Sequence, residues 1–112
     1  MRPDRLFLSD ILKAIDLVAQ FIALGRESFL NDVKTQDAVI RRIEVIGEAA
    51  RHLSDELRSR HPELPWSRII GMRNELAHGY FSVDLNIVWI AAAERLPAMR
   101  QPVQAILDGL DA

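Results

Sequence analysis

Apolar residues recur at intervals of three and four positions along most of this chain, and this spacing constrains its fold more than any other feature. In residues 4–24 the apolar positions fall on one face of a helix: Leu8, Ile11, Leu12, Ile15, Val18, Ala19 and Ile22. No segment keeps the strict alternation of apolar and polar residues that a half-buried strand requires. We therefore expect an all-α protein.

The ends of the first two helices are marked by glycine and proline. Gly25 follows the first helix, where a residue able to adopt a positive φ ends a helix. A second, longer helix is expected to begin near Thr35 or Asp37 and to end at His61-Pro62, since proline disfavours the α conformation in the residue before it. The intervening residues 26–34 are expected to form a polar connection that packs three apolar side chains onto the core: Phe29, Leu30 and Val33.

The second half of the chain predicts shorter helices. Pro65 suits the first turn of a third helix, which continues to Gly79. Asp84 is expected to cap a fourth helix over residues 85–96, and Pro97 either kinks it or separates a final helix that ends near Leu110. These segments predict an up-and-down bundle of four to five helices in a single domain over residues 1–112.

Composition narrows the class of protein. The chain has 112 residues, which suit one domain, and its longest apolar stretches are interrupted by charged residues too often for a membrane span or a signal peptide. Cysteine is absent, which excludes disulfides and cysteine-based zinc sites and fits a cytoplasmic protein. The formal net charge is −2, so any RNA contact would have to come from a local cluster of arginines.

Residues 73–80, Arg-Asn-Glu-Leu-Ala-His-Gly-Tyr, carry most of the reactive groups. Arg73 is a permanent cation that matches phosphate oxygens, and His78 can transfer a proton near neutral pH from the last turn of a helix. Asn74 lies one turn before His78, on the same face. The pattern suits cleavage of a phosphodiester, but the same residues also describe an ordinary helix end with an ion-pairing arginine and a packed phenol, Tyr80.

The pattern Arg73-Asn74-x-x-x-His78-x-Tyr80 resembles the RX4HXY motif of HepT-type HEPN-domain toxins, which are encoded beside a minimal nucleotidyltransferase antitoxin. The resemblance covers nearly the whole chain. Its other characteristic stretches occur in the expected order: residues 35–39, Ile46-Gly47-Glu48-Ala49, Pro65-Trp66, residues 70–74 and Val83-Asp84.

The resemblance implies an all-α HEPN fold and a homodimer in which two motifs line one cleft. It also implies RNA cleavage without a metal or another cofactor, with Arg73, His78 and Asn74 as catalytic residues. In such pairs the antitoxin can transfer AMP to the motif tyrosine, here Tyr80, and this modification would control the toxin.

Several other residues are weaker candidates. Glu48 could orient Arg73 or His78, or it could belong to an internally paired, solvated helix face. Arg41 and Arg42 could bind RNA phosphates or serve only solubility. The remaining histidines and the tryptophans are expected at the surface and in core or dimer contacts, respectively: His52, His61, Trp66 and Trp89.

Two rival functions stay open. One is a catalytically silent helical subunit that docks the partner nucleotidyltransferase and presents nucleotides or Tyr80 to it. The other is a plain helical interaction module, in which residues 73–80 would have no chemical role. RNA cleavage by the purified protein separates both rivals from the ribonuclease.

Overall fold

The computed structural model describes residues 3–78 and 83–111, with the backbone alone for Glu75, Ala77 and His78. Its long helices are α1 (Asp4–Phe21), α3 (Val33–His52), α5 (Trp66–His78) and α7 (Leu96–Asp111). The shorter segments are α2 (Arg26–Leu30), α4 (Asp55–Arg60), α6 (Leu85–Ile90) and a π-helical stretch, η1 (Ala91–Arg95). Since the described residues contain helices and no strand, the expected all-α fold is confirmed.

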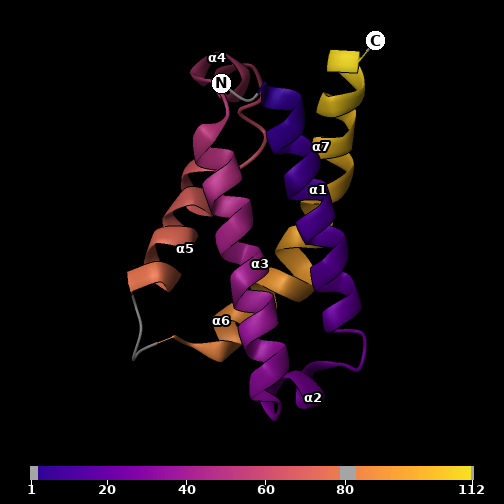
Figure 1. The fold of residues 1–112 in the computed structure, drawn as a ribbon, viewed down its shortest axis with the longest axis vertical. Helices are drawn as coiled ribbons and strands as arrows, with labels where there is room; N and C mark the ends of the chain where they lie inside the picture. The colour runs from indigo at the N-terminus through magenta and orange to yellow at the C-terminus, as the bar shows by residue number, and fades with distance from the viewer. Residues whose placement is uncertain (1–2, 79–82, 112) are drawn as a thin grey trace.

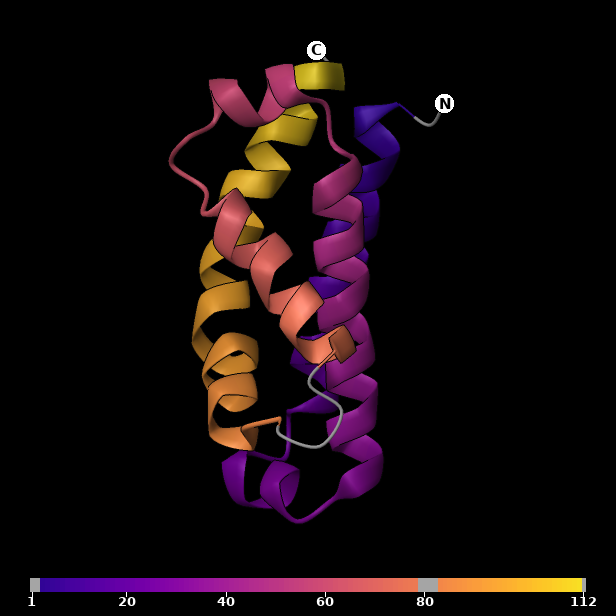
Figure 2. The ribbon, with the colours of Figure 1, turned by 90° about the vertical axis from the view of Figure 1, so that its left-hand side faces the viewer.

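Helix α3 lies at the centre of the bundle, with α1 packed on one side and α5 on the other, while α7 packs against α1 (Figure 1). Figure 2 shows α5 from the front, lying between α3 and the C-terminal helix. The start of α1 and the end of α7 lie at the same end as α4, where Arg5 and Asp111 approach to 3.4 Å. The core is filled from both halves of the chain by fully buried side chains such as Leu8, Ile11, Val18, Phe29, Val39, Ile46, Val88 and Val103.

The connection between α1 and α3 differs in part from expectation. Helix α1 ends at Phe21, before the predicted end at Leu24. Gly25 adopts a positive φ of 98°, as predicted, but it precedes the short helix α2 over residues 26–30 instead of ending α1. Phe29 is buried and Leu30 packs on the core, whereas Val33 is 68% exposed and opens α3. The reason is Asp32, whose carboxylate accepts hydrogen bonds from the Lys34 backbone N–H and the Thr35 hydroxyl and so caps α3 earlier than predicted.

The long second helix was predicted wrongly, because it is two helices. Helix α3 ends at His52, Leu53 and Ser54 are extended, and α4 runs from Asp55 to Arg60. Ser54 caps α4 through its hydroxyl, which accepts from the Leu57 backbone N–H at 3.2 Å. It also donates from its own N–H and hydroxyl to the Asp4 carboxylate at 2.9 and 2.6 Å. These contacts hold the break next to the start of α1.

The remaining boundaries agree with the sequence in outline. Helix α5 follows Pro65, and the carboxylate of Asp84 accepts from the Asn86 backbone N–H at 2.9 Å and caps α6. Pro97 neither breaks nor ends the C-terminal helix, since the backbone stays helical from α6 through η1 into α7. Pro97 lacks the N–H that would pair with the preceding turn, and the wider η1 stretch lies directly before it.

Candidate active site

Arg73 of α5 packs directly against Gly47 of α3. A Cβ placed on Gly47 would lie 2.1 Å from the Arg73 Cβ, closer than Cβ atoms approach other atoms, and 3.1 Å from the Ile69 carbonyl oxygen, which is a tight contact. The absence of a side chain at Gly47 therefore allows α5 to lie directly on α3. This contact fixes the position of the Arg73 Cβ atom relative to α3.

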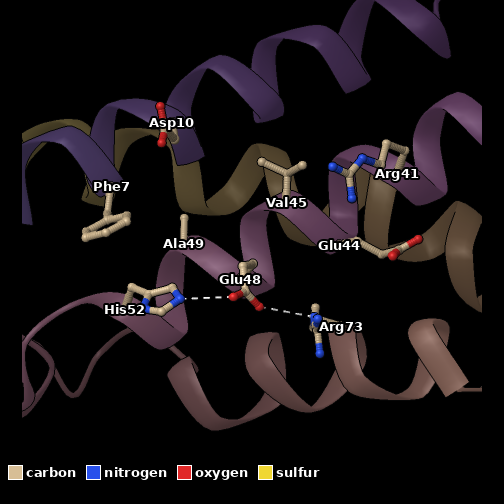
Figure 3. Close-up of a pocket in the computed structure, with 9 residues that line it drawn as sticks. All are labelled: Phe7, Asp10, Arg41, Glu44, Val45, Glu48, Ala49, His52 and Arg73. Carbon is tan, nitrogen blue, oxygen red and sulfur yellow. Dashed lines mark hydrogen bonds and ion pairs between the residues drawn. The ribbon is translucent and has the colours of Figure 1, made fainter. Parts of the chain in front are cut away.

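The guanidinium of Arg73 is anchored by two neighbours. Its Nε lies 3.4 Å from Glu48 Oε2 on α3 (Figure 3). Its Nη1 donates to Asn74 Oδ1 at 3.0 Å. The Arg73 side chain is 30% exposed, so it contacts Glu48 and remains accessible to solvent. A fork held at Nε and Nη1 presents a fixed cation to a phosphate, which is the geometry expected for binding an anion.

The carboxylate of Glu48 contacts three side chains, those of Arg51, His52 and Arg73. Its Oε1 accepts from Arg51 Nη2 at 2.8 Å and lies 2.9 Å from His52 Nε2, while Oε2 is buried and faces Arg73. The Oε2 contact at 3.4 Å is an ion pair without hydrogen-bond geometry. Hydrogen bonds from Arg51 and then His52, with the charges of Arg51 and Arg73, lower the pKa of Glu48 to about 2. Glu48 thus belongs to a paired helix face and also lies within ion-pair distance of Arg73, while its role in orienting Arg73 stays a prediction.

His52 lies at the surface, as expected, and makes two contacts that the sequence did not predict. Besides its contact with Glu48, its ring stacks on Phe7 of α1, with centroids 5.5 Å apart and planes at 19°. Sequence reasoning placed it at the surface, and its side chain is indeed 46% exposed. The signal that could have identified it is the spacing of four residues from Glu48, which puts both on one helix face.

These groups line one small pocket on the face formed by α1, α3 and α5. Its volume is about 190 Å³, and its walls are Phe7, Asp10, Arg41, Glu44, Val45, Glu48, Ala49, His52 and Arg73 (Figure 3). Of the two arginines proposed as RNA contacts, Arg41 lines this pocket and Arg42 does not. The structure therefore separates a pair that the sequence could not.

The other residues of the motif are placed only in part. His78 is the last residue of α5, in its last turn as predicted. Its side chain lies outside the described part of the structure. Tyr80 also lies outside the described residues. Asn74 is exposed and contacts Arg73.

The remaining histidine and the tryptophans stand apart from the pocket. His61 lies 3.3 Å from Glu63. Trp66 is buried in the core and donates its indole N–H to the His61 carbonyl at 2.9 Å. Trp89 packs against Phe29 at 5.6 Å. Of the core or dimer contacts expected for the tryptophans, both residues make core contacts.

Metal-ligand clusters and membrane-spanning helices are both absent from residues 3–78 and 83–111. In these ranges no three histidine, aspartate or glutamate side chains gather in a way that could hold a metal ion. None of the helices in the same ranges is long and apolar enough to span a bilayer.

Known proteins resemble the chain along most of its length. Residues 11–106 match the family described as ribonuclease HepT-like. The chain is 41% identical over 95 residues to a probable ribonuclease HepT of Thermococcus cleftensis, covering 84% of this chain and 86% of that protein. It is 34% identical over 106 residues to a putative RNase of Methanocaldococcus jannaschii, covering 94% and 97%. No solved structure gives a significant match.

Proposed function

The chain belongs to the HepT-like ribonuclease family, and on that premise we propose that it is an endoribonuclease whose reaction is carried by Arg73 and His78. The observation that carries the proposal is the anchored guanidinium of Arg73 at the rim of the pocket, five positions before the histidine that ends α5. The arginine neutralises the charge that grows on the phosphoryl oxygens, and the histidine moves the protons.

In the proposed reaction the ribose 2′-hydroxyl attacks the neighbouring phosphate and expels the 5′-oxygen of the next nucleotide. His78 removes the proton from the 2′-hydroxyl or donates one to the leaving oxygen. Arg73 holds the phosphate, and Asn74 keeps Nη1 of Arg73 in place through its 3.0 Å hydrogen bond. We propose that this route needs no metal ion or other cofactor.

Cleavage of single-stranded RNA by the purified protein tests this assignment. Arg73→Ala and His78→Ala are each expected to lower the rate by about two orders of magnitude or more, while a chelator leaves the rate unchanged. Wild-type rates in either variant would refute the roles of these residues. Cleavage of DNA, which lacks the 2′-hydroxyl, would refute the route.

We further propose that two copies of the chain form the working unit, with both motifs in one cleft. An apolar groove of about 560 Å³ between α3, α5 and the C-terminal helix supports this, since it contains Ile69 and Met72 directly beside Arg73. Ile87 of the same groove is 52% exposed, and Ile90 nearby in sequence is 40% exposed. Trp66, for which the sequence allows a core or a dimer contact, is buried within one copy of the chain.

Light scattering tests the dimer. A monomeric mass at micromolar concentration that does not change on raising the protein concentration would exclude the shared cleft. Ile87→Asp should weaken the dimer, whereas Leu24→Asp, which changes an 86% exposed residue outside the groove, should not.

The biological setting proposed is a toxin–antitoxin pair in the cytoplasm, with a neighbouring nucleotidyltransferase as antitoxin. We propose that this enzyme transfers AMP to Tyr80. A phosphate on that residue would compete for Arg73, and the attached purine would occupy the path of the substrate. Coexpression should then add one or more AMP masses at Tyr80 and abolish cleavage, while Tyr80→Phe keeps its activity and escapes inhibition. An unmodified Tyr80 in a fully inhibited complex would indicate inhibition by masking.

A further inference from the structure

His52 links helix α1 to the anchored arginine of α5. Its ring lies on Phe7 of α1, and its Nε2 lies 2.9 Å from Glu48 Oε1 on α3. The other oxygen of the same carboxylate faces Arg73 Nε at 3.4 Å (Figure 3). A continuous series of contacts therefore runs from Phe7 through His52 and Glu48 to Arg73.

The two oxygens of Glu48 share one negative charge. Oε1 already binds Arg51 and His52, while Oε2 is buried and has no hydrogen-bond partner among the described residues, so it acts on Arg73 by charge alone. Any positive charge added at Oε1 reduces the attraction that Oε2 exerts on Arg73. His52 is the neighbour that can add such a charge, because histidine gains a proton in the range of about pH 5 to 8.

We propose that His52 is a positioning residue for RNA cleavage, which acts through Glu48 to set how firmly Arg73 is held. The neutral ring leaves the full carboxylate charge on Arg73 and keeps the guanidinium fixed. The protonated ring offsets that charge and makes Arg73 more available to a phosphate of the RNA. This inference rests on the proposed function of Arg73 and adds a residue and a proton to it.

Other charged groups lie near this series of contacts and also affect the charge around Arg73. Arg41 and Glu44 of α3 and Asp10 of α1 line the same pocket, and Arg51 binds the same carboxylate oxygen as His52. Carboxyl and guanidinium groups ordinarily titrate outside the range of histidine. The proton of His52 is therefore separable from these groups by substitution at one position.

Two substitutions separate the proton of His52 from its hydrogen bond. His52→Gln keeps an N–H donor for Glu48 but cannot become charged, whereas His52→Ala removes the donor and the stacked ring. His61→Gln is the matched control, because His61 pairs with Glu63 away from the pocket. We expect His52→Ala to lower kcat on the order of tenfold, His52→Gln to retain it at pH 8, and the control to match the wild type.

The pH dependence of KM for RNA is the readout that a merely structural role would not move. The KM of the wild type should fall between pH 8 and pH 6, and this fall should be about threefold larger than that of His52→Gln. The reason is the one positive charge that His52 adds several ångströms from the phosphate site. Equal loss of kcat in the alanine and glutamine variants, or identical pH profiles of wild type and His52→Gln, would overturn the proposal.

A second measurement does not depend on cleavage. In a His78→Gln background, which removes the other titrating group of the motif, the NMR signal of the Arg73 Nε–H is followed from pH 8 to pH 5. It should shift with a histidine titration and lose that shift when His52→Gln is added. A shift of the Arg73 Nε–H signal that persists after His52→Gln would overturn the coupling, even if the wild-type protein cleaves RNA. If His52→Gln abolishes the shift but the wild-type protein cleaves no RNA, the coupling is retained and the proposed function is refuted.

Discussion

Replacing Gly47 with alanine should damage the site more than it damages the fold. The added Cβ would stand 2.1 Å from the Arg73 Cβ and 2.8 Å from its Cγ, whereas carbon atoms in contact lie about 3.5–4.0 Å apart. The Cβ of Arg73 is fixed to its backbone, so no rotation of the side chain relieves the first contact. Helix α5 must therefore move away from α3 by about 1.5 Å at Arg73.

The two consequences differ in size. Overpacking of this kind costs about 1–3 kcal/mol, and the better helix propensity of alanine returns about 1 kcal/mol, so the net loss of stability should be about 0–2 kcal/mol. A displacement of about 1 Å in a catalytic group can lower a rate by about a hundredfold. We expect Gly47→Ala to fold, to unfold a few degrees earlier and to lose most of its activity on RNA.

Gly71→Ala provides the control within the same helix pair. A Cβ at Gly71 meets no atom within 4 Å, so this substitution should add about 1 kcal/mol of stability and leave the activity unchanged. Thermal unfolding followed by circular dichroism and the kcat/KM for a single-stranded RNA give both quantities. Full activity in Gly47→Ala would refute the inference that this contact sets the position of Arg73.

Three further predictions concern charge and capping. Glu48→Gln should lower stability at neutral pH, as measured by urea titrations. Because the pKa of Glu48 is lowered to about 2, the larger free energy of unfolding of the wild type should be lost as the pH falls from about 4.5 to about 2. Ser54→Ala should cost about 1–2 kcal/mol in thermal unfolding, since it removes the cap of α4 and a hydrogen bond to Asp4. Arg41→Ala should weaken RNA binding and reduce the slope of log Kd against log salt by about 0.7, and Arg42→Ala should change neither; equal effects would show that the pocket is not the contact.

The features that the sequence predicted are those encoded locally. Asp84 caps α6 and Gly25 takes a positive φ because capping and turn formation depend on the residue itself and its nearest neighbours. The break between α3 and α4 was missed, since Ala50, Leu53 and Leu57 keep helical spacing across it while the backbone does not. What holds that break is the carboxylate of Asp4, fifty residues earlier, and no local pattern reports such a contact.

The same distinction applies to the site. Arg73 was selected from its motif, and its catalytic role stays a prediction. Its 3.4 Å ion pair with Glu48 is a contact that the sequence could suggest but not establish. The contact of His52 with Phe7 was not predicted, because Phe7 belongs to another helix. Contacts that join three helices depend on how the helices pack, and periodicity alone does not specify the crossing point.

The π-helical stretch η1 has a consequence for how the gene can change length. A π turn holds about one residue more than an α turn, and η1 contains three consecutive alanines, two of them buried. Deleting one of Ala91–Ala93 would let this stretch become ordinary α-helix while Val88 before it and Met99 after it keep their buried faces. The same deletion in the middle of α3 would rotate every later residue of that helix by about 100° and turn its apolar stripe away from the core. Homologues are therefore expected to gain or lose a single codon at this point of the C-terminal helix more readily than within α3.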